Sequence, residues 1–240
     1  MQKPSLWVVI PAAGLSKRFS DAGFSTPKAL LQIKSKKNIS LPMVSHVINS
    51  VDYYSVDRFI TPDKIIVGLP FGHDNKDILV PKTFIKNTLG QADTIFQLIS
   101  DLPENDKVLV LDCDMVLNSK DIRKLVEMGQ VYDVALAVTE TFDPNSSRVD
   151  QVPFPTMFVE KEPISSFGIV GARTFKNIGK LREALKKTMQ EHLLNGKEPY
   201  LSSSLNHYPG KKFALVVDEF QDWGTPQRVT DSGASIIDNL

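Results

Sequence analysis

Two aspartates, Asp112 and Asp114, follow a short run of large apolar residues at 108–111. Such a run is typical of a strand that is buried on both faces, as in a parallel sheet. Side chains two residues apart in a strand point to the same side, so this spacing predicts two adjacent carboxylates. A divalent cation would relieve their repulsion, because hard cations prefer oxygen ligands. A strand followed by an aspartate that caps the next helix is the simpler interpretation of the same pattern.

A second chemical feature is a loop of small residues with two cations downstream, Arg18 and Lys28. The loop follows an apolar run at 6–10, and its small residues are Ala12, Ala13 and Gly14. Backbone N–H groups in such a loop can form a cradle for an anion, to which the two cations would add charge. The loop matches neither G-x-G-x-x-G nor the P-loop pattern. An ordinary turn with two surface cations is the alternative.

The elements that must hold these residues are strands alternating with helices. Apolar runs predict further strands at 64–69, 132–138 and 213–217, and helical spacing predicts helices at 41–51, 90–102, 119–129 and 175–193. Open α/β sheets bind ligands outside the carboxyl ends of their strands, where both chemical features stand. His46, beside the first of these helices, is predicted to be a packed or surface histidine and not a ligand.

Two polar stretches carry no strong pattern of their own. The stretch 140–155 is polar and holds three prolines, which predicts a mobile loop between ordered elements. The stretch 200–207 is rich in hydroxyl groups, which suits a sugar ligand but equally suits any loop.

The composition bounds the class of protein. The chain has 240 residues, 42% of them hydrophobic, which is enough for one large domain or two intimate halves. Its 28 basic and 28 acidic residues give no net charge, so we expect neither a nucleic-acid surface nor a membrane patch. The single cysteine, Cys113, excludes an intrachain disulfide and a multi-cysteine zinc site. A cytoplasmic protein is expected.

The segment 9–19, together with Pro27-Lys28-Ala29-Leu30, resembles the signature of the nucleotidyltransferases that activate sugar 1-phosphates. In that family the glycine-rich loop wraps a nucleoside triphosphate, and an arginine and the lysine of the Pro-Lys pair hold its phosphates. The resemblance implies those phosphate contacts for Arg18 and Lys28, and nucleotide contacts for the small residues of the loop. Ser16 stands where a second loop glycine is usual. A serine at this position is similar to the loop of the molybdenum-cofactor nucleotidyltransferases.

Later segments extend the resemblance over roughly residues 8–229. Gly90-Gln91-Ala92 resembles the segment that contacts the base and sugar of the nucleotide, although a helix start with a turning glycine explains it equally well. The residues that resemble the family's acceptor site are Glu160, Lys161 and Gly168. The glutamate and lysine match a pair that reaches the sugar phosphate, and the glycine matches one that approaches the sugar.

The resemblance also implies a metal site. Asp222 precedes Gly-Thr-Pro at the start of the last predicted helix, as does the second metal-binding aspartate of the family. Mg²⁺ would thus be held by Asp114 and Asp222, with Asp112 in support. An aspartate that merely caps the last helix is the alternative, and both uses are compatible.

The fold that the resemblance implies is a Rossmann-like three-layer α/β/α sandwich with a mostly parallel central sheet, of the GT-A-like type. One nucleotidyltransferase domain would span residues 1–240, with a nucleotide-binding half at about 1–118 and an acceptor-binding half at about 119–240. The implied reaction transfers a nucleoside monophosphate from a nucleoside triphosphate to a sugar 1-phosphate or a similar small phosphorylated acceptor, with release of pyrophosphate. Such a reaction serves nucleotide-sugar and polysaccharide biosynthesis. Association of the chain with itself stays open.

Three other functions are compatible with parts of the pattern. A cytidylyltransferase for methylerythritol phosphate or phosphocholine shares the Pro-Ala-Ala-Gly loop, but the methylerythritol type has His-Asp-Ala-Ala-Arg where this chain has 111–115. A D-x-D glycosyltransferase would not need Arg18 and Lys28 for pyrophosphate. A nucleotide-sensing subunit without turnover would not need the four charged residues together. The base and the acceptor are not determined by the sequence, since one glutamine amide can serve several bases.

Overall fold

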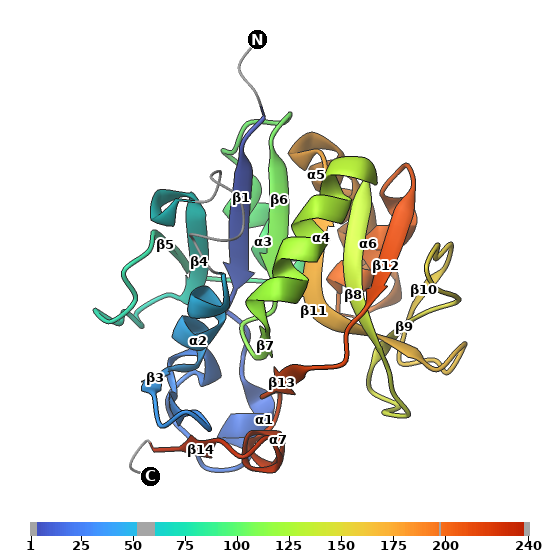
Figure 1. The fold of residues 1–240 in the computed structure, drawn as a ribbon. Helices are drawn as coiled ribbons and strands as arrows, with labels where there is room; N and C mark the ends of the chain where they lie inside the picture. Colours follow the sequence, from blue (N-terminus) through green and yellow to red (C-terminus); the bar gives the residue numbers. More distant parts are fainter. Residues whose placement is uncertain (1–3, 52–60, 197, 238–240) are drawn as a thin grey trace.

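A computed structural model describes residues 4–51, 61–196 and 198–237 of the chain. Within these residues, a nine-stranded sheet forms the centre of the molecule (Figure 1). Its strands are β1 (Leu6–Pro11), β4 (Ile65–Pro70), β5 (Lys82–Ile85), β6 (Lys107–Leu111), β8 (Val134–Glu140), β9 (Ser147–Val149), β10 (Phe158–Glu160), β11 (Phe167–Phe175) and β12 (Lys212–Val216). The helices are α1 (Lys17–Ser20), α2 (Met43–Ser50), α3 (Gln91–Ile99), α4 (Ser119–Val131), α5 (Ile178–Asn195), α6 (Leu201–His207) and α7 (Pro226–Asp231).

The sheet is mixed, with a parallel centre. Strand β1 lies between β6 and β4 and is parallel to both, and β5 is parallel to β4. Strand β11 then pairs antiparallel to β6 and to β8, and β12 runs parallel to β8. The carboxyl ends of β1 and β6, which precede the two predicted chemical features, therefore meet at one edge of the sheet.

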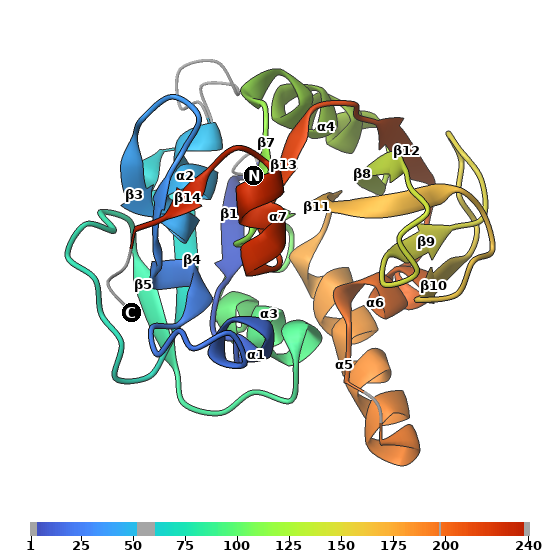
Figure 2. The same cartoon turned by 90° about the horizontal axis from the view of Figure 1, so that it is seen from below.

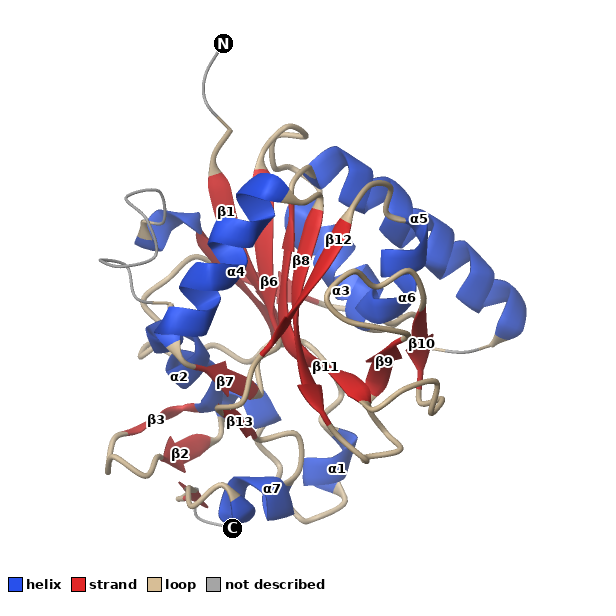
Figure 3. Ribbon diagram, turned by 45° about the vertical axis from the view of Figure 1, so that its right-hand side comes forward, coloured by secondary structure: helices blue, strands red, loops and turns tan. Residues whose placement is uncertain are grey.

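The helices cover both faces of the sheet, because the central strands are apolar on both faces (Figure 3). Val8 and Leu109 pack with buried residues of α2 and α4 on one face. Val9 and Val110, whose side chains alternate with them, pack with α3, α5 and α6 on the other. The result is the three-layer α/β/α sandwich that the sequence predicts. Among the described residues, no helix combines the length and the apolar character that crossing a membrane requires.

A smaller layer lies beyond the carboxyl ends of β1 and β6. It consists of the pair β7 (Met115–Leu117) and β13 (Phe220–Asp222), and of the sheet of β2 (Gln32–Lys34), β3 (Ser40–Pro42) and β14 (Ser235–Ile236). Figure 2 shows α7 and β13 in front of the end of β1. A third core, which includes Phe19, Leu31, Met43, Trp223 and Val229, holds this layer together. The last segment of the chain is thereby brought back to the first loop.

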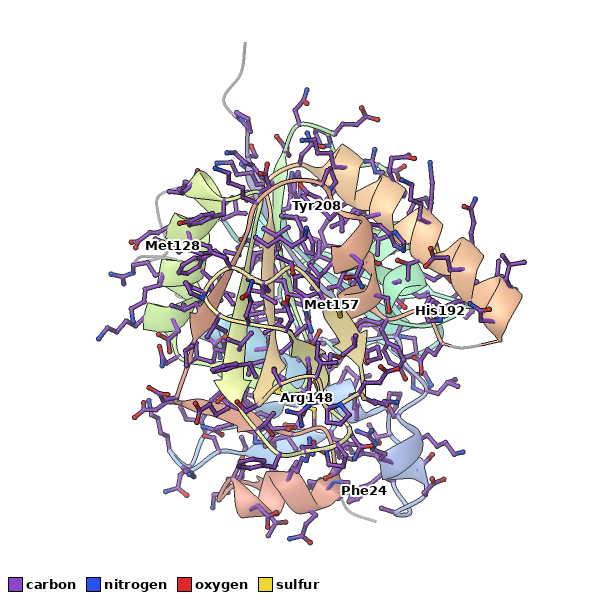
Figure 4. All side chains as sticks on the ribbon, turned by 90° about the vertical axis from the view of Figure 1, so that its right-hand side faces the viewer. Phe24, Met128, Arg148, Met157, His192 and Tyr208 are labelled. Carbon is purple, nitrogen blue, oxygen red and sulfur yellow. The ribbon has the colours of Figure 1, made fainter. Side chains whose placement is uncertain are left out.

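Two expectations from the sequence are wrong. The stretch 140–155 is not all loop, because β9 lies within it. Arg148, labelled in Figure 4, is buried, and its guanidinium donates to the carbonyls of Thr141, Asp143 and Ser165 at 2.7–2.8 Å. The helix predicted at 175–193 begins three residues later, because Phe175 pairs with Val134 in the sheet.

His46 is packed beneath the smaller layer, in agreement with the sequence prediction. Its Nε2 donates to the Ile33 carbonyl at 2.9 Å, and its ring meets Trp223 edge-on at 5.1 Å. Burial lowers the pKa of His46 below 6.5, although the hydrogen bond to Ile33 opposes this shift. The unfolded chain therefore takes up the proton at a higher pH than the folded chain does.

Stability is accordingly expected to fall as the pH drops below about 6.5, because protonation of His46 favours the unfolded chain. The variant His46→Gln keeps an N–H donor but cannot titrate, and it should lose less stability over the same pH range. Urea unfolding of both proteins between pH 7.5 and 5 measures the difference. Parallel curves of unfolding free energy against pH would show that His46 contributes nothing to acid sensitivity.

Candidate active site

Asp114 and Lys28 form an ion pair at the carboxyl end of β6. The Lys28 Nζ donates to Asp114 Oδ2 at 2.5 Å, and the two side chains are 23% and 15% exposed. Burial alone would lower the pKa of Lys28, but the nearby carboxylate outweighs it and raises the pKa above its ordinary value. Burial alone would likewise raise the pKa of Asp114, and Lys28 outweighs it, so that this pKa is lowered. Both groups are therefore charged at neutral pH.

Asp222 and Arg18 converge on the same point. Strand β13 pairs with β7, which sets Asp222 opposite Met115 in the ladder, and Trp223 N–H donates to the carbonyl of Asp114 at 2.8 Å. A β-carbon placed on Gly224 would lie 3.1 Å from Asp222 Oδ1, 3.6 Å from Asp114 Oδ2 and 4.0 Å from Arg18 Nη1. Two carboxylates and a guanidinium from three distant segments thus surround one glycine.

This donor set is suited to a divalent cation that also binds substrate. Asp114 and Asp222 offer hard carboxylate oxygens at one place, which is the ligand type that Mg²⁺ uses together with phosphate oxygens and water. Among the described residues, no three side chains of histidine, cysteine, aspartate or glutamate form a metal site by themselves. Burial, together with the charge of Asp114, raises the pKa of Asp222 despite the opposing Gly224 N–H and Arg228, as expected where two carboxylates share a site without a metal.

Asp112 does not share the direction of Asp114. Strand β6 ends at Leu111, and residues 112–114 form a turn, so the alternation of side chains along a strand no longer applies. The Asp112 carboxylate accepts from Arg173 Nη1 at 3.1 and 3.2 Å and from Gln91 Nε2 at 2.6 Å. The prediction of two carboxylates on one side is wrong, and Asp112 is engaged by protein donors and not aimed at the point near Gly224.

The loop after β1 lines a pocket of about 480 Å³. The pocket lies between this loop, the end of β4 and residues 85–88, and the loop residues that line it include Ala13, Gly14 and Ser16. Ala12 lies just inside, where its side chain is buried and its N–H donates to the Gly68 carbonyl at 2.8 Å. Nothing lies within 4 Å of a β-carbon placed on Gly14, so the loop backbone is open to a ligand there.

Ser16 links the loop to the backbone of Lys28. Its φ of 54° lies in the left-handed region that favours glycine. Its Oγ accepts the Lys28 N–H at 3.0 Å and lies 3.4 Å from the Gly14 carbonyl, to which it donates. A serine here thus adopts a glycine-like backbone and adds a bond that glycine could not make.

Substitution of Ser16 should separate stability from activity. Ser16→Gly relieves a strained backbone worth roughly 1 kcal/mol, which offsets the lost hydrogen bond, so its melting temperature should stay near that of the wild type and above that of Ser16→Ala. Ser16→Ala keeps the strain, and both variants lose a hydrogen bond worth about 1 kcal/mol that positions Lys28. Both should raise the KM for the triphosphate about fivefold, as measured by initial rates. A wild-type KM in both variants would show that the hydroxyl does not position Lys28.

The Gly90-Gln91-Ala92 segment opens α3 but is covered by the protein's own chain. Gly90 has a φ of 151°, and a β-carbon there would lie 2.7 Å from Glu198 Cγ and 3.0 Å from Pro199 Cδ. Ala92 is fully buried, and its N–H donates to the Pro199 carbonyl at 3.0 Å. The close approach that requires a glycine here is therefore made by residues 198–199.

Of the residues predicted to hold an acceptor, Lys161 contacts Tyr200, which neighbours Pro199. Glu160 accepts from Ser147 Oγ at 2.6 Å, and burial raises its pKa. Lys161, with a φ of 57°, donates to the Tyr200 hydroxyl at 3.1 Å and lies 5.0 Å from the centre of the same ring. Gly168 is buried in β11, where a β-carbon would lie 2.4 Å from Thr141 Cγ2, so that this glycine is required by packing.

The hydroxyl-rich stretch 200–207 is mostly helix α6 and not a loop. Ser202 and Ser204 are buried, and Ser204 Oγ donates to Thr188 of α5 at 2.9 Å. The Ser204 hydroxyl therefore joins α6 to α5.

A comparison with models of protein families matches residues 8–197 to the MobA-like NTP transferase domain. The chain belongs to this family. It is a nucleotidyltransferase, and the match includes Arg18, Lys28 and Asp114, although it ends before Asp222. No curated protein matches the chain in sequence.

Solved structures of nucleotidyltransferases share the fold. A nucleoside-diphosphate-sugar pyrophosphorylase from Vibrio cholerae RC9 superposes with a TM-score of 0.74 at 20% identity, covering 94% of this chain and 98% of that one. A UDP-glucose pyrophosphorylase from Acinetobacter baumannii gives 0.71 at 15% identity over 95% and 92% of the two chains. A UTP-bound enzyme from the same organism gives 0.71 at 16% identity over 96% and 92%. At these identities the likeness establishes the Rossmann-like fold.

Sequence reasoning missed two arginines of this nucleotidyltransferase. Arg173 is 4% exposed and binds Asp112, while Arg228 of α7 pairs with Asp222 at 2.5 Å and also with Asp143. Neither stands in a recognisable motif. The signal for Arg173 is a cation in the middle of an otherwise apolar strand, which requires a buried partner.

Proposed function

We propose that this nucleotidyltransferase moves a nucleoside monophosphate from a nucleoside triphosphate to a sugar 1-phosphate or a similar small phosphorylated acceptor, and releases pyrophosphate. The observation that carries the proposal is the convergence of Asp114, Asp222, Arg18 and Lys28, with the Lys28 N–H bonded to Ser16 of the open loop. The nucleotide is assigned to the half at about 1–118 and the acceptor to the half at about 119–240. A cytoplasmic location stays a prediction.

The triphosphate would enter the pocket beside Ala13 and Gly14, with its phosphates toward Lys28 and Arg18. Lys28, held by Asp114, and the exposed Arg18 supply positive charge where pyrophosphate departs. Lys28 is fixed by Asp114 before the substrate binds, so little reorganisation of this charge is required during the reaction.

A phosphate oxygen of the acceptor would attack the α-phosphorus in line, forming one P–O bond as the bond to pyrophosphate breaks. The nucleophile is already an anion, so the protein needs no general base. Glu160 and Lys161 are proposed to orient the acceptor. When bound to Asp114 and Asp222, Mg²⁺ would neutralise charge at the α-phosphate and bring the two anionic substrates together.

The experiment that tests the proposal is an assay of pyrophosphate release with each nucleoside triphosphate, Mg²⁺ and a panel of phosphorylated sugars. Release that depends on both a triphosphate and a sugar 1-phosphate is the expected result. Release only with methylerythritol phosphate or phosphocholine would reassign the acceptor. Transfer from a nucleotide sugar without pyrophosphate release would overturn the proposal in favour of a glycosyltransferase.

A further inference from the structure

Gln91, Asp112 and Arg173 form a polar junction between the two halves of the site. Gln91 Nε2 donates to Asp112 Oδ1 at 2.6 Å, and Gln91 Oε1 accepts the Leu201 N–H at 3.3 Å. The Arg173 guanidinium holds the same carboxylate from β11 through two contacts of 3.1 and 3.2 Å. Both ends of the Gln91 amide are thus engaged by the protein, one by the residue after β6 and one at the start of α6.

The junction fixes the segment 198–201 on the start of α3. Besides the Leu201 bond, Ala92 N–H donates to the Pro199 carbonyl at 3.0 Å, and Gly90 leaves room for Glu198 and Pro199. Three consecutive residues of α3 and its cap therefore dock the same short segment. A change at Gln91 would reach residues 198–201 directly.

The docked segment carries the group that holds Lys161. Tyr200 lies between Pro199 and Leu201, and its hydroxyl accepts from Lys161 Nζ at 3.1 Å and donates to Glu198 at 3.0 Å. Glu160, the neighbour of Lys161, lies close enough to Arg173 and Asp112 for both charges to act on its pKa, which Arg173 lowers and Asp112 raises. The junction thus lies near Glu160 and is linked to Lys161 through the docked segment.

We infer that Gln91 is a positioning residue for the acceptor and does not read the base. Its amide is held by the protein at both ends, because turning it toward a base would leave Asp112 Oδ1 and the Leu201 N–H without this partner. Gln91 acts through Asp112, Tyr200 and Lys161, and Arg173 fixes Asp112 for that purpose. The inference rests on the proposed function for the identity of the acceptor, but the docking itself does not depend on it.

The first test compares Gln91→Leu with the wild type in steady-state kinetics. The KM for the acceptor should rise about tenfold, as expected when hydrogen bonds worth one order of magnitude are lost, while the KM values and ranking of the triphosphates stay unchanged. Gln190→Leu, the same change at an exposed glutamine of α5, is the matched control and should behave as wild type. A changed ranking of triphosphates with an unchanged acceptor KM would overturn the inference.

Exchanging the amide and the carboxylate between positions 91 and 112 tests the contact between Gln91 and Asp112. Gln91→Glu alone sets two carboxylates against each other and should raise the acceptor KM more than Gln91→Leu does. The double variant Gln91→Glu with Asp112→Asn restores a carboxylate and an amide, and it should recover part of that loss. Purely additive effects of the two changes on the KM for the acceptor would show that Gln91 and Asp112 do not interact.

Hydrogen exchange separates failure of this inference from failure of the proposed function. In Gln91→Leu the amides of residues 198–207 should exchange faster, while those of the loop at 12–16 keep their wild-type rates. This readout needs no substrate, so it stands even if the wild type releases no pyrophosphate. Unchanged exchange at 198–207 would show that Gln91 does not hold the segment.

Discussion

Asp114→Ala is expected to lower kcat/KM at least about a hundredfold, and Asp222→Ala to do the same. Each change removes one of the two carboxylates that meet beside Gly224, and loss of a single preorganised stabilising group commonly costs that much. Asp114→Ala also leaves Lys28 without its partner at 2.5 Å, which disturbs the charge meant for pyrophosphate. Pyrophosphate release at saturating triphosphate, acceptor and Mg²⁺ measures the effect.

The control for these losses is Asp218→Ala, an exposed aspartate four residues before Asp222. It should keep wild-type activity. Asp114→Asn retains the shape of the side chain, so it should lose activity like alanine while disturbing the fold less, as thermal unfolding would report. Near-normal turnover of either alanine variant, with Mg²⁺ held constant, would remove that residue from the site.

Lys28→Ala is expected to lower kcat/KM for the triphosphate by about a hundredfold, with a smaller effect on the KM for the acceptor. Lys28 is a partly buried cation of the loop region, and its pKa, raised by Asp114 against the effect of burial, keeps it charged. A fixed charge at the leaving group stabilises the transition state more than the ground state. The reverse reaction, followed as triphosphate formed from pyrophosphate, should show a matching rise in the KM for pyrophosphate.

Lys17→Ala is the matched control, because Lys17 is an exposed cation of the same loop region. It should leave both KM values unchanged apart from weak screening effects. If Lys28→Ala altered only the acceptor kinetics, the division of phosphate contacts between Lys28 and Lys161 would be wrong.

The fold follows from local patterns that the sequence displays directly. The apolar runs around Val9 and Val110 can only be buried on both faces, which requires helices on each side of a sheet. The order and spacing of the loop, the Pro-Lys pair and the aspartate at 114 indicated the family. The antiparallel place of β11 was beyond this reasoning, because an apolar strand does not reveal its direction.

The sequence predicted the site residues whose places are set by the backbone. It missed the contacts that depend on which side chains pair with one another. Asp114 and Asp222 converge because strand ends and one short ladder bring them together. Asp112 diverges because β6 ends at Leu111, three residues before Asp114, so the alternation of side chains along a strand does not apply to this pair. The engagement of Gln91 by Asp112 and Leu201 joins residues more than twenty positions apart, which no local pattern encodes.

The pairing of β6 with β11 has a consequence for how activity is acquired during folding. This pair joins the first half of the chain to the second, and its last ladder contact, Leu111 with Ala172, lies directly before the turn that carries Asp114. A nascent chain that stops at residue 118 would contain the triphosphate loop but would leave β6 as an unpaired edge strand, which can pair with other chains and aggregate. We therefore expect activity to arise in the same cooperative event as the pairing of β6 with β11, so that a partly folded chain does not turn over nucleotide.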